Sequence, residues 1–185
     1  MEGKEKRYYG PFNLDIPRMG FIILYKHDKG IVGDLIKKQQ LKMGFNEEEA
    51  SFTHVEVSGG GPWAVYVGTP RSSVIHIKEK YRGRTARIVR IKIPAHMTGP
   101  KYWRKLAKVA FWAATHCNLK YDFLGIAGFL TSLVKHAHSR YFCSENTLWA
   151  IHKEFDSLPM QDDNCMPAHF TDKDYFSIVW EGVLR

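Results

Sequence analysis

The segment FTHVEVSGGGPWAVYV, residues 52–67, decides the fold more than any other part of the chain. Residues 52–58 and 63–67 are two short runs rich in β-branched and aromatic residues, and the linker between them is three glycines followed by Pro62. A linker of this kind between two strand-forming runs predicts a β-hairpin. Alternate side chains of a strand point to the same face, so His54 and Glu56 share one face of the first strand.

Three further strands are predicted outside the hairpin. Residues 20–25, GFIILY, form an apolar run that ends at a charged turn, which is typical of a buried strand. Residues 86–93 alternate apolar side chains with Arg90 and Lys92, which predicts a strand with one wet face that Pro94 terminates. Residues 176–184 provide a terminal strand.

The helical predictions lie mainly in the second half of the chain. Asp34 is expected to cap a short helix over residues 35–43 that ends at Gly44, and the acidic residues 46–49 are expected to form a solvated loop or turn. From residue 101 onward, one helical stripe collects five apolar residues: Leu106, Val109, Ala110, Ala113 and Cys117. This stripe predicts that Cys117 is a core residue, and residues 121–134 and 144–155 are predicted as two more helices.

The fold class expected from this order of elements is α+β, with an antiparallel sheet packed against helices. The chain has 185 residues, of which 44% are hydrophobic, so it can bury a real core but is too short for two ordinary domains. We therefore expect a single domain over residues 1–185, with its core at about 20–185 and an N-terminal extension at 1–18.

The N-terminal residues and the longest apolar stretch bear on the cellular location of the protein. Residues 1–7 are charged and lead into a proline-containing segment, so no secretory signal is expected. The longest apolar stretch, residues 121–134, is shorter than the roughly 20 residues that span a bilayer. We expect synthesis in the cytoplasm, with release by lysis or carriage in a virion as routes to an external substrate.

The formal charge of +8 predicts attraction to anionic partners such as a wall polymer or a membrane surface. The basic residues are spread along the chain without an aromatic-interleaved nucleic-acid motif, so no specific nucleic-acid binding is predicted. The three cysteines, at positions 117, 143 and 165, form no CxxC pair and argue against a disulfide framework or a zinc site. His136 and His138 lack nearby carboxylate or thiol partners in the sequence, so we expect a polar loop there and neither a metal nor a cofactor.

The segment RYFCSEN, residues 140–146, places Cys143 where a polar stretch turns into a helical pattern. Backbone N–H groups and the positive end of the helix dipole favour a thiolate at such a position, and the same N–H groups can hold an oxyanion. His54 is the best candidate for its base, because its strand neighbours and the hairpin fix the ring. Ser144 and Glu145 are interpreted as scaffold of the helix start.

Three quoted segments carry a family resemblance: FTHVE at residues 52–56, YDFLGIAG at 121–128 and YFCSE at 141–145. Together they resemble the circularly permuted branch of the NlpC papain-like superfamily, which includes YiiX-like and YaeF-like amidases and relatives of lecithin:retinol acyltransferase. The histidine strand precedes the cysteine helix in that branch, as it does here, and the similarity covers roughly residues 20–151. The resemblance implies that Cys143 is the nucleophile and His54 the base, and that the segment around Tyr121 packs behind the catalytic helix.

The third, orienting residue departs from the family pattern, since no clear polar residue faces His54 across the hairpin. Glu56 is ranked first because a carboxylate would fix the imidazole tautomer and stabilise the imidazolium. Tyr66 is the alternative, and His76 is a distant third that is better interpreted as a surface residue. Tyr66, Tyr121 and Phe142, together with Trp63 and Trp149, are candidates to line a substrate groove, although most of them are expected to be core residues.

The resemblance implies a cysteine hydrolase that cleaves an amide or peptide bond through an acyl-enzyme, with a cell-wall peptide as the leading substrate. Two alternatives stay open. One is a lipid thioesterase or acyltransferase built on the same core, and the other is a catalytically silent binding or structural module of a phage or virion.

Overall fold

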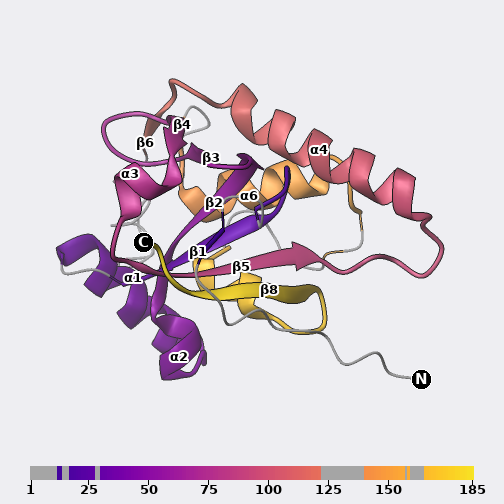
Figure 1. Cartoon of the computed structure of the whole chain (residues 1–185). Helices are drawn as coiled ribbons and strands as arrows, with labels where there is room; N and C mark the ends of the chain where they lie inside the picture. The colour runs from indigo at the N-terminus through magenta and orange to yellow at the C-terminus, as the bar shows by residue number, and fades with distance from the viewer. Residues whose placement is uncertain (1–11, 14–16, 28–29, 122–139, 157, 159–164) are drawn as a thin grey trace.

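The computed structural model describes residues 12–13, 17–27, 30–121, 140–156, 158 and 165–185, and it shows a mixed α+β fold (Figure 1). Six strands form one antiparallel sheet in the order β4-β3-β2-β1-β5-β8. Their bounds are β1 Ile22–Lys26, β2 Phe52–Gly60, β3 Trp63–Tyr66, β4 Ser73–His76, β5 Thr85–Ile91 and β8 Phe176–Val183. A second, two-stranded parallel sheet joins β6 Lys120–Tyr121 to β7 Arg140–Tyr141.

The predicted hairpin is confirmed. β2 and β3 pair antiparallel with Val57 opposite Val65, and the register shifts near the turn, where Gly60 pairs with Trp63. Gly60 has φ +95° and Gly61 has φ +58°, a backbone region that favours glycine. The glycine-rich linker therefore fixes where β2 ends and, through the register, which residues face one another.

The sheet is centred on β1 and β2. All of β1 except Lys26 is buried, and β1 pairs with β2 on one side and with β5 on the other. In the β1–β2 register Tyr25 lies opposite His54 and Ile23 opposite Glu56. Since paired residues share a sheet face, this register places Tyr25 beside the predicted catalytic strand residues.

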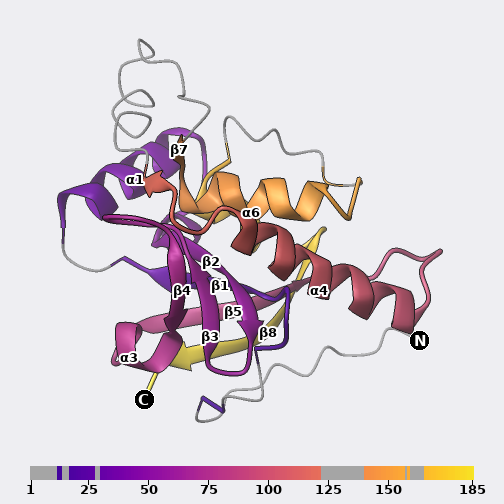
Figure 2. The same cartoon turned by 90° about the horizontal axis from the view of Figure 1, so that it is seen from above.

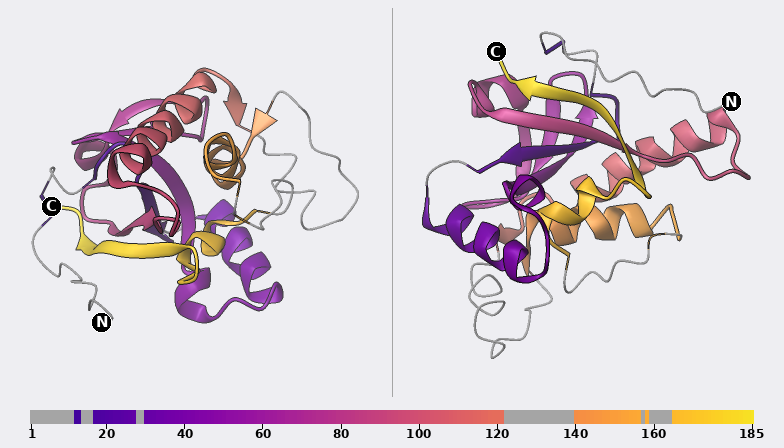
Figure 3. Two further views of the ribbon diagram at one scale, coloured as in Figure 1. Left: turned by 90° about the vertical axis from the view of Figure 1, so that its right-hand side faces the viewer. Right: turned by 90° about the horizontal axis from the view of Figure 1, so that it is seen from below.

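The helices are α1 Ile31–Lys42, α2 Glu47–Ala50, α3 Ile77–Tyr81, α4 Gly99–Thr115 and α6 Cys143–His152, with a 3₁₀ helix at Pro167–Thr171. Seen from above, α4 and α6 run side by side next to the strands (Figure 2), and Trp112 of α4 donates a hydrogen bond to Glu154, just after α6 (3.0 Å). In the left panel of Figure 3, α6 is seen end on beside the curved sheet. α6 also contacts β2, and its first residue lies next to that strand.

Several local predictions need correction. Asp34 does not cap α1, which begins earlier at Ile31 after Gly30; its carboxylate instead contacts His27 Nε2 at 2.8 Å. Residues 46–49 are not simply a loop, because Asn46 and Glu49 form a reciprocal capping box that starts α2. β4 and α3 are not predicted from the sequence.

The strand predicted at residues 86–93 ends sooner, at Ile91, and Ile93 is exposed. Of the two residues predicted on its wet face, Arg90 is half-buried and Lys92 is exposed, while Arg87 of the same strand is buried. Cys117 lies beyond the end of α4 and is only half-buried, although it packs against the core. The helix predicted at 121–134 and the histidines at 136 and 138 lie outside the described residues, apart from the backbone of Tyr121 in β6. Within the described ranges, no helix is long and apolar enough to cross a membrane.

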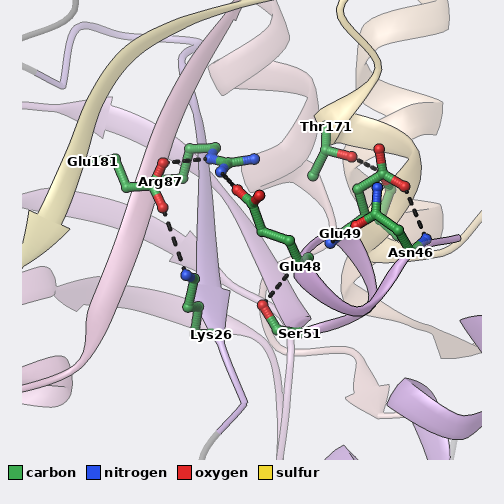
Figure 4. Close-up of polar contacts among 9 residues, drawn as sticks. Lys26, Asn46, Glu48, Glu49, Ser51, Arg87, Thr171 and Glu181 are labelled. Atoms are coloured by element: carbon green, nitrogen blue, oxygen red, sulfur yellow. Dashed lines mark hydrogen bonds and ion pairs between the residues drawn. The ribbon is translucent and has the colours of Figure 1, made fainter.

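Arg87 is held by carboxylates from two distant elements (Figure 4). Its Nε donates to Glu181 of β8 at 2.9 Å, and Nη2 donates to Glu48 of α2. The guanidinium also lies 4.6 Å from the centre of the Phe52 ring. This cluster ties α2 and β8 to β5.

We expect Arg87→Ala to lower the free energy of unfolding by about 1–3 kcal/mol, because two charge-assisted hydrogen bonds and the packing on Phe52 are lost while the carboxylates regain water. Urea denaturation measures this change. The matched control is Glu48→Gln, which removes only the more exposed partner and should stay within about 1 kcal/mol of the parent. Equal stability of Arg87→Ala and the parent would contradict the structural role given to this cluster.

Candidate functional site

Cys143 is the first residue of α6 and is only 2% exposed. Phe142 precedes it in an extended conformation, and the Glu145 carboxylate accepts a hydrogen bond from the Phe142 N–H (2.9 Å). Thr147 Oγ1 donates to the Cys143 carbonyl one turn later (2.8 Å). These hydrogen bonds fix the backbone around Cys143 at the start of α6. The first N–H groups of the helix have no acceptor within the helix itself.

His54 and Cys143 meet between β2 and α6. Their side chains form a hydrogen bond, although 89 positions separate them in the sequence (143 − 54). Burial of the ring lowers the pKa of His54, but the negative charge and hydrogen bond of Cys143, followed by those of Glu56, raise it more, so that the pKa is about 9 rather than 6.5. His54 is therefore protonated at neutral pH and lies beside the Cys143 sulfur.

Glu56 occupies the other side of the ring. Its Oε1 lies 3.1 Å from His54 Nε2, so the remaining ring nitrogen, Nδ1, is the one available to Cys143. The Glu56 side chain has no exposed surface, whereas 17% of the His54 side chain is exposed. The three residues form a Cys–His–Glu chain in which a carboxylate fixes the orientation of the imidazole.

Two phenols hold Glu56 in place. Tyr25 donates to Oε2 at 3.0 Å, and Tyr81, at the end of α3, donates to Oε1 at 2.5 Å. Burial, and then the Glu56 charge, raise the pKa of Tyr25 well above its usual value, and the same two causes raise the pKa of Tyr81. Both hydroxyl groups therefore stay protonated and donate to the carboxylate.

Tyr66 lies beside this chain without joining it. Its ring centre is 5.7 Å from that of His54, but its hydroxyl donates to the Thr69 carbonyl (3.3 Å). Burial raises the pKa of Tyr66, and the charges of Glu56 and Cys143 contribute to the rise, which places the phenol near both groups. Of the two candidates for the orienting position, Glu56 contacts the imidazole nitrogen, and Tyr66 lies beside the ring without a hydrogen bond to it.

The other candidates lie away from this chain. His76 starts α3, where its Nδ1 accepts the Glu79 N–H (3.4 Å) and its ring packs edge-on against the exposed Trp63. Trp149 stacks on His116 (4.1 Å between ring centres), and Phe142 is buried. The side chain of Tyr121 lies outside the described residues.

The two residues that follow Cys143 in the first turn of α6 hold the surrounding structure together. Ser144 Oγ donates to the Cys165 carbonyl (2.6 Å), which ties the segment before the 3₁₀ helix to α6, and Glu145 caps the helix as described above. Cys165 is buried, and burial raises the pKa of Cys117. Among the described residues, no group of three or more histidine, cysteine or acidic side chains could hold a metal ion.

Tyr25 and Tyr81 are the site residues that sequence reasoning missed. Tyr25 was interpreted only as part of an apolar strand, and its signal would have been the β1–β2 register, which the strand pattern alone does not give. Tyr81 belongs to a helix that was not predicted at all. The whole sequence matches no protein-family model and no curated protein, so the geometry above carries the functional argument.

We expect Glu56→Gln to shift the pKa of His54 from about 9 toward 6.5, because the substitution removes the carboxylate charge that favours the imidazolium. NMR titration of the histidine ring protons, with His54 assigned from a His54→Gln variant, measures the shift. Glu79→Gln is the matched control, because Glu79 lies next to His76 instead.

The same titration has a consequence for stability. A histidine whose pKa is raised on folding adds stability that is fully present below the unfolded pKa of 6.5 and is lost as the pH rises through about 9. The difference in unfolding free energy between the parent and Glu56→Gln should therefore shrink over that interval. An unchanged His54 titration in Glu56→Gln would refute the contact.

Tyr81→Phe should lower the free energy of unfolding by about 1–3 kcal/mol, since it removes a buried hydrogen bond to a carboxylate. Tyr66→Phe, which loses only a bond to a loop carbonyl, should cost about 1 kcal/mol or less. Urea denaturation of the two variants at one pH gives the comparison. If Tyr66→Phe proves the more damaging of the two, the assignment of Tyr81 as the support of Glu56 is wrong.

Proposed function

We propose that the protein is a cysteine hydrolase that cleaves amide bonds through an acyl-enzyme, with Cys143 as nucleophile, His54 as general base and acid, and Glu56 as the orienting residue. The observation that carries the proposal is the continuous contact Cys143–His54–Glu56. A fully buried carboxylate on one imidazole nitrogen and a helix-start thiol on the other is the arrangement that nucleophilic cysteine catalysis requires.

The first half of the reaction forms the acyl-enzyme. With His54 already protonated in the resting pair, the Cys143 sulfur attacks the carbonyl carbon, so a C–S bond forms and the C=O electron pair moves onto oxygen. Backbone N–H groups at the start of α6 lie where they can stabilise this oxyanion. When the tetrahedral intermediate collapses, His54 gives its proton to the amide nitrogen, the C–N bond breaks and the amine leaves.

The second half releases the acid. His54 takes a proton from water, the hydroxide attacks the thioester carbon, and the C–S bond breaks, which returns the Cys143 sulfur beside a protonated His54. Glu56 keeps its negative charge throughout and stabilises each imidazolium. Tyr25 and Tyr81 keep the carboxylate still, so the ring does not have to be reoriented between the two proton transfers.

The titration of His54 favours an amide over a thioester substrate. An amine is a poor leaving group unless it is protonated, whereas a thiolate leaves unaided. With a pKa of about 9, His54 is an imidazolium at neutral pH and can supply that proton. The proton donor that amide cleavage requires is therefore already present in the resting pair.

The class of amide follows from resemblance. The segments around His54 and Cys143 resemble the permuted NlpC-type papain-like superfamily, and the antiparallel sheet, the helix-start cysteine and the histidine strand before it are consistent with that fold. Its members commonly cut peptidoglycan amides, and a net charge of +8 would draw the enzyme to an anionic wall. A cell-wall peptide is accordingly the proposed substrate.

The test measures iodoacetamide labelling of each cysteine against pH, with peptide mapping, in the parent and in His54→Ala. We expect Cys143 to react rapidly at neutral pH, well below the ordinary thiol pKa of about 8.5, and to slow at least about tenfold in His54→Ala because the thiolate loses its counter-ion. Cys117 serves as the internal control, since its rate should be the same in both proteins.

Mass spectrometry after incubation with peptidoglycan fragments then reports turnover and acyl-enzyme, with Cys143→Ser as the inactive control. If Cys143 is labelled no faster than Cys117, the catalytic proposal is wrong and the alternative of a catalytically silent binding module is favoured. A reactive Cys143 with no cleavage of wall peptides would keep the cysteine chemistry and reject the substrate.

A further inference from the structure

We propose that the outer face of α4 docks the protein on an anionic lipid bilayer. The inference is independent of the catalytic proposal, because it rests on a different helix and on different residues. α4 lies at the outside of the molecule in Figures 1 and 2, and its buried stripe of Tyr102, Leu106, Val109, Ala110 and Ala113 faces the core.

The outward side of α4 is basic. Its sequence, GPKYWRKLAKVAFWAAT, contains four basic residues and no acidic one. Lys101, Arg104 and Lys108 are exposed, and at spacings of three and four residues they line one side of the helix. Only Lys108 of these three has an ion-pair partner within the described part of the chain, Glu154 at 3.8 Å. The positive charge is therefore largely uncompensated.

Two large aromatic side chains stand beside these charges. Phe111 is 61% exposed and Trp103 is 36% exposed, and with Ala107 between them they follow one another at four-residue spacing along the same flank. Arg18 packs its guanidinium over the Trp103 ring at 4.9 Å, which adds one more positive charge at the N-terminal end of the face. Isolated exposed apolar residues are ordinary, but here a phenylalanine lies among arginine and lysine side chains on one helix.

This combination fits a bilayer surface better than a protein or a soluble polymer. Lysine is depleted at protein–protein interfaces, and one helix face is small for a stable protein partner. A soluble polyanion would bind the basic side chains but offers no apolar environment for the Phe111 ring. An anionic bilayer uses both, because its headgroups attract lysine and arginine while aromatic rings partition into the interfacial region.

The experiment is flotation of the protein with vesicles of phosphatidylcholine alone and with vesicles that also contain phosphatidylserine. We expect binding only to the second kind, weakening as salt is added. Lys101→Glu/Arg104→Glu should weaken it at least about tenfold, given that each basic residue near the surface contributes about a fivefold factor. Phe111→Ala should weaken it about threefold or more, because insertion of the ring is lost.

Matched controls lie on α1. Lys38→Glu/Lys42→Glu changes the net charge by the same amount, and Met43→Ala removes another exposed apolar side chain, so both should bind like the parent. If both charge-reversal variants lost vesicle binding equally, the proposal would be wrong, and the net charge of the protein would explain the binding. Unchanged binding by Phe111→Ala would overturn it in favour of a purely ionic contact, as on a soluble polyanion. A concentration-dependent dimer that Phe111→Ala dissociates without vesicles would assign the face to a second copy of the chain.

Discussion

The buried carboxylate of Glu56 is the constraint on which the site depends. A carboxylate without exposed surface costs several kcal/mol of lost hydration unless it is paired and hydrogen-bonded. Here it has three partners: the phenols of Tyr25 and Tyr81 and the His54 ring. They come from β1, α3 and β2, so this one charge requires the register of β1 on β2 and the return of the chain through β4 into α3.

The same constraint reaches Cys143 through the ring. Because Nε2 of His54 is committed to Glu56, only Nδ1 is left for Cys143, and α6 must place its first residue there. Contacts near both ends of α6 fix its position: Asn146 and His116 share a hydrogen bond of 2.6 Å, and Glu154, just after the helix, accepts from Trp112 at 3.0 Å. The hydrogen bonds from α4 and the residue after it therefore fix the position and rotation of α6 relative to β2.

The sequence predicted those parts of this arrangement that are written in local patterns. The hairpin followed from its glycine linker, the buried central strand from its apolar run, and the helix beginning near Cys143 from the change of period. Strand alternation predicts that Glu56 shares a face with His54, and the chemistry of a carboxylate ranks it ahead of Tyr66; the structure brings Glu56 to the ring. What could not be predicted depends on tertiary pairing: Tyr25 becomes a site residue only through the register opposite His54, and Tyr81 only through a five-residue helix with little periodicity of its own.

The errors have a common physical cause. Asp34 and residues 46–49 were assigned from single side chains, but helix starts are decided by which group satisfies the free N–H donors. Asn46 and Glu49 satisfy them reciprocally, while α1 begins before Asp34 without a side-chain cap. Arg87 was missed as a buried residue because its two carboxylate partners lie 39 and 94 positions away along the chain.

The two charge clusters of the sheet differ in a way that bears on function. Arg87 is paired with Glu48 and Glu181, both of which keep contact with water, so the cluster costs little desolvation and links surface elements. The Glu56 side chain has no exposed surface, and replacing a buried ion pair by apolar residues of the same volume often leaves stability unchanged or raises it. Stability alone gives no reason to hold a carboxylate between two phenols and an imidazole. We infer that this carboxylate is retained for what it does to His54, since it keeps the ring charged and pointed at the only thiol at a helix start in the described part of the chain.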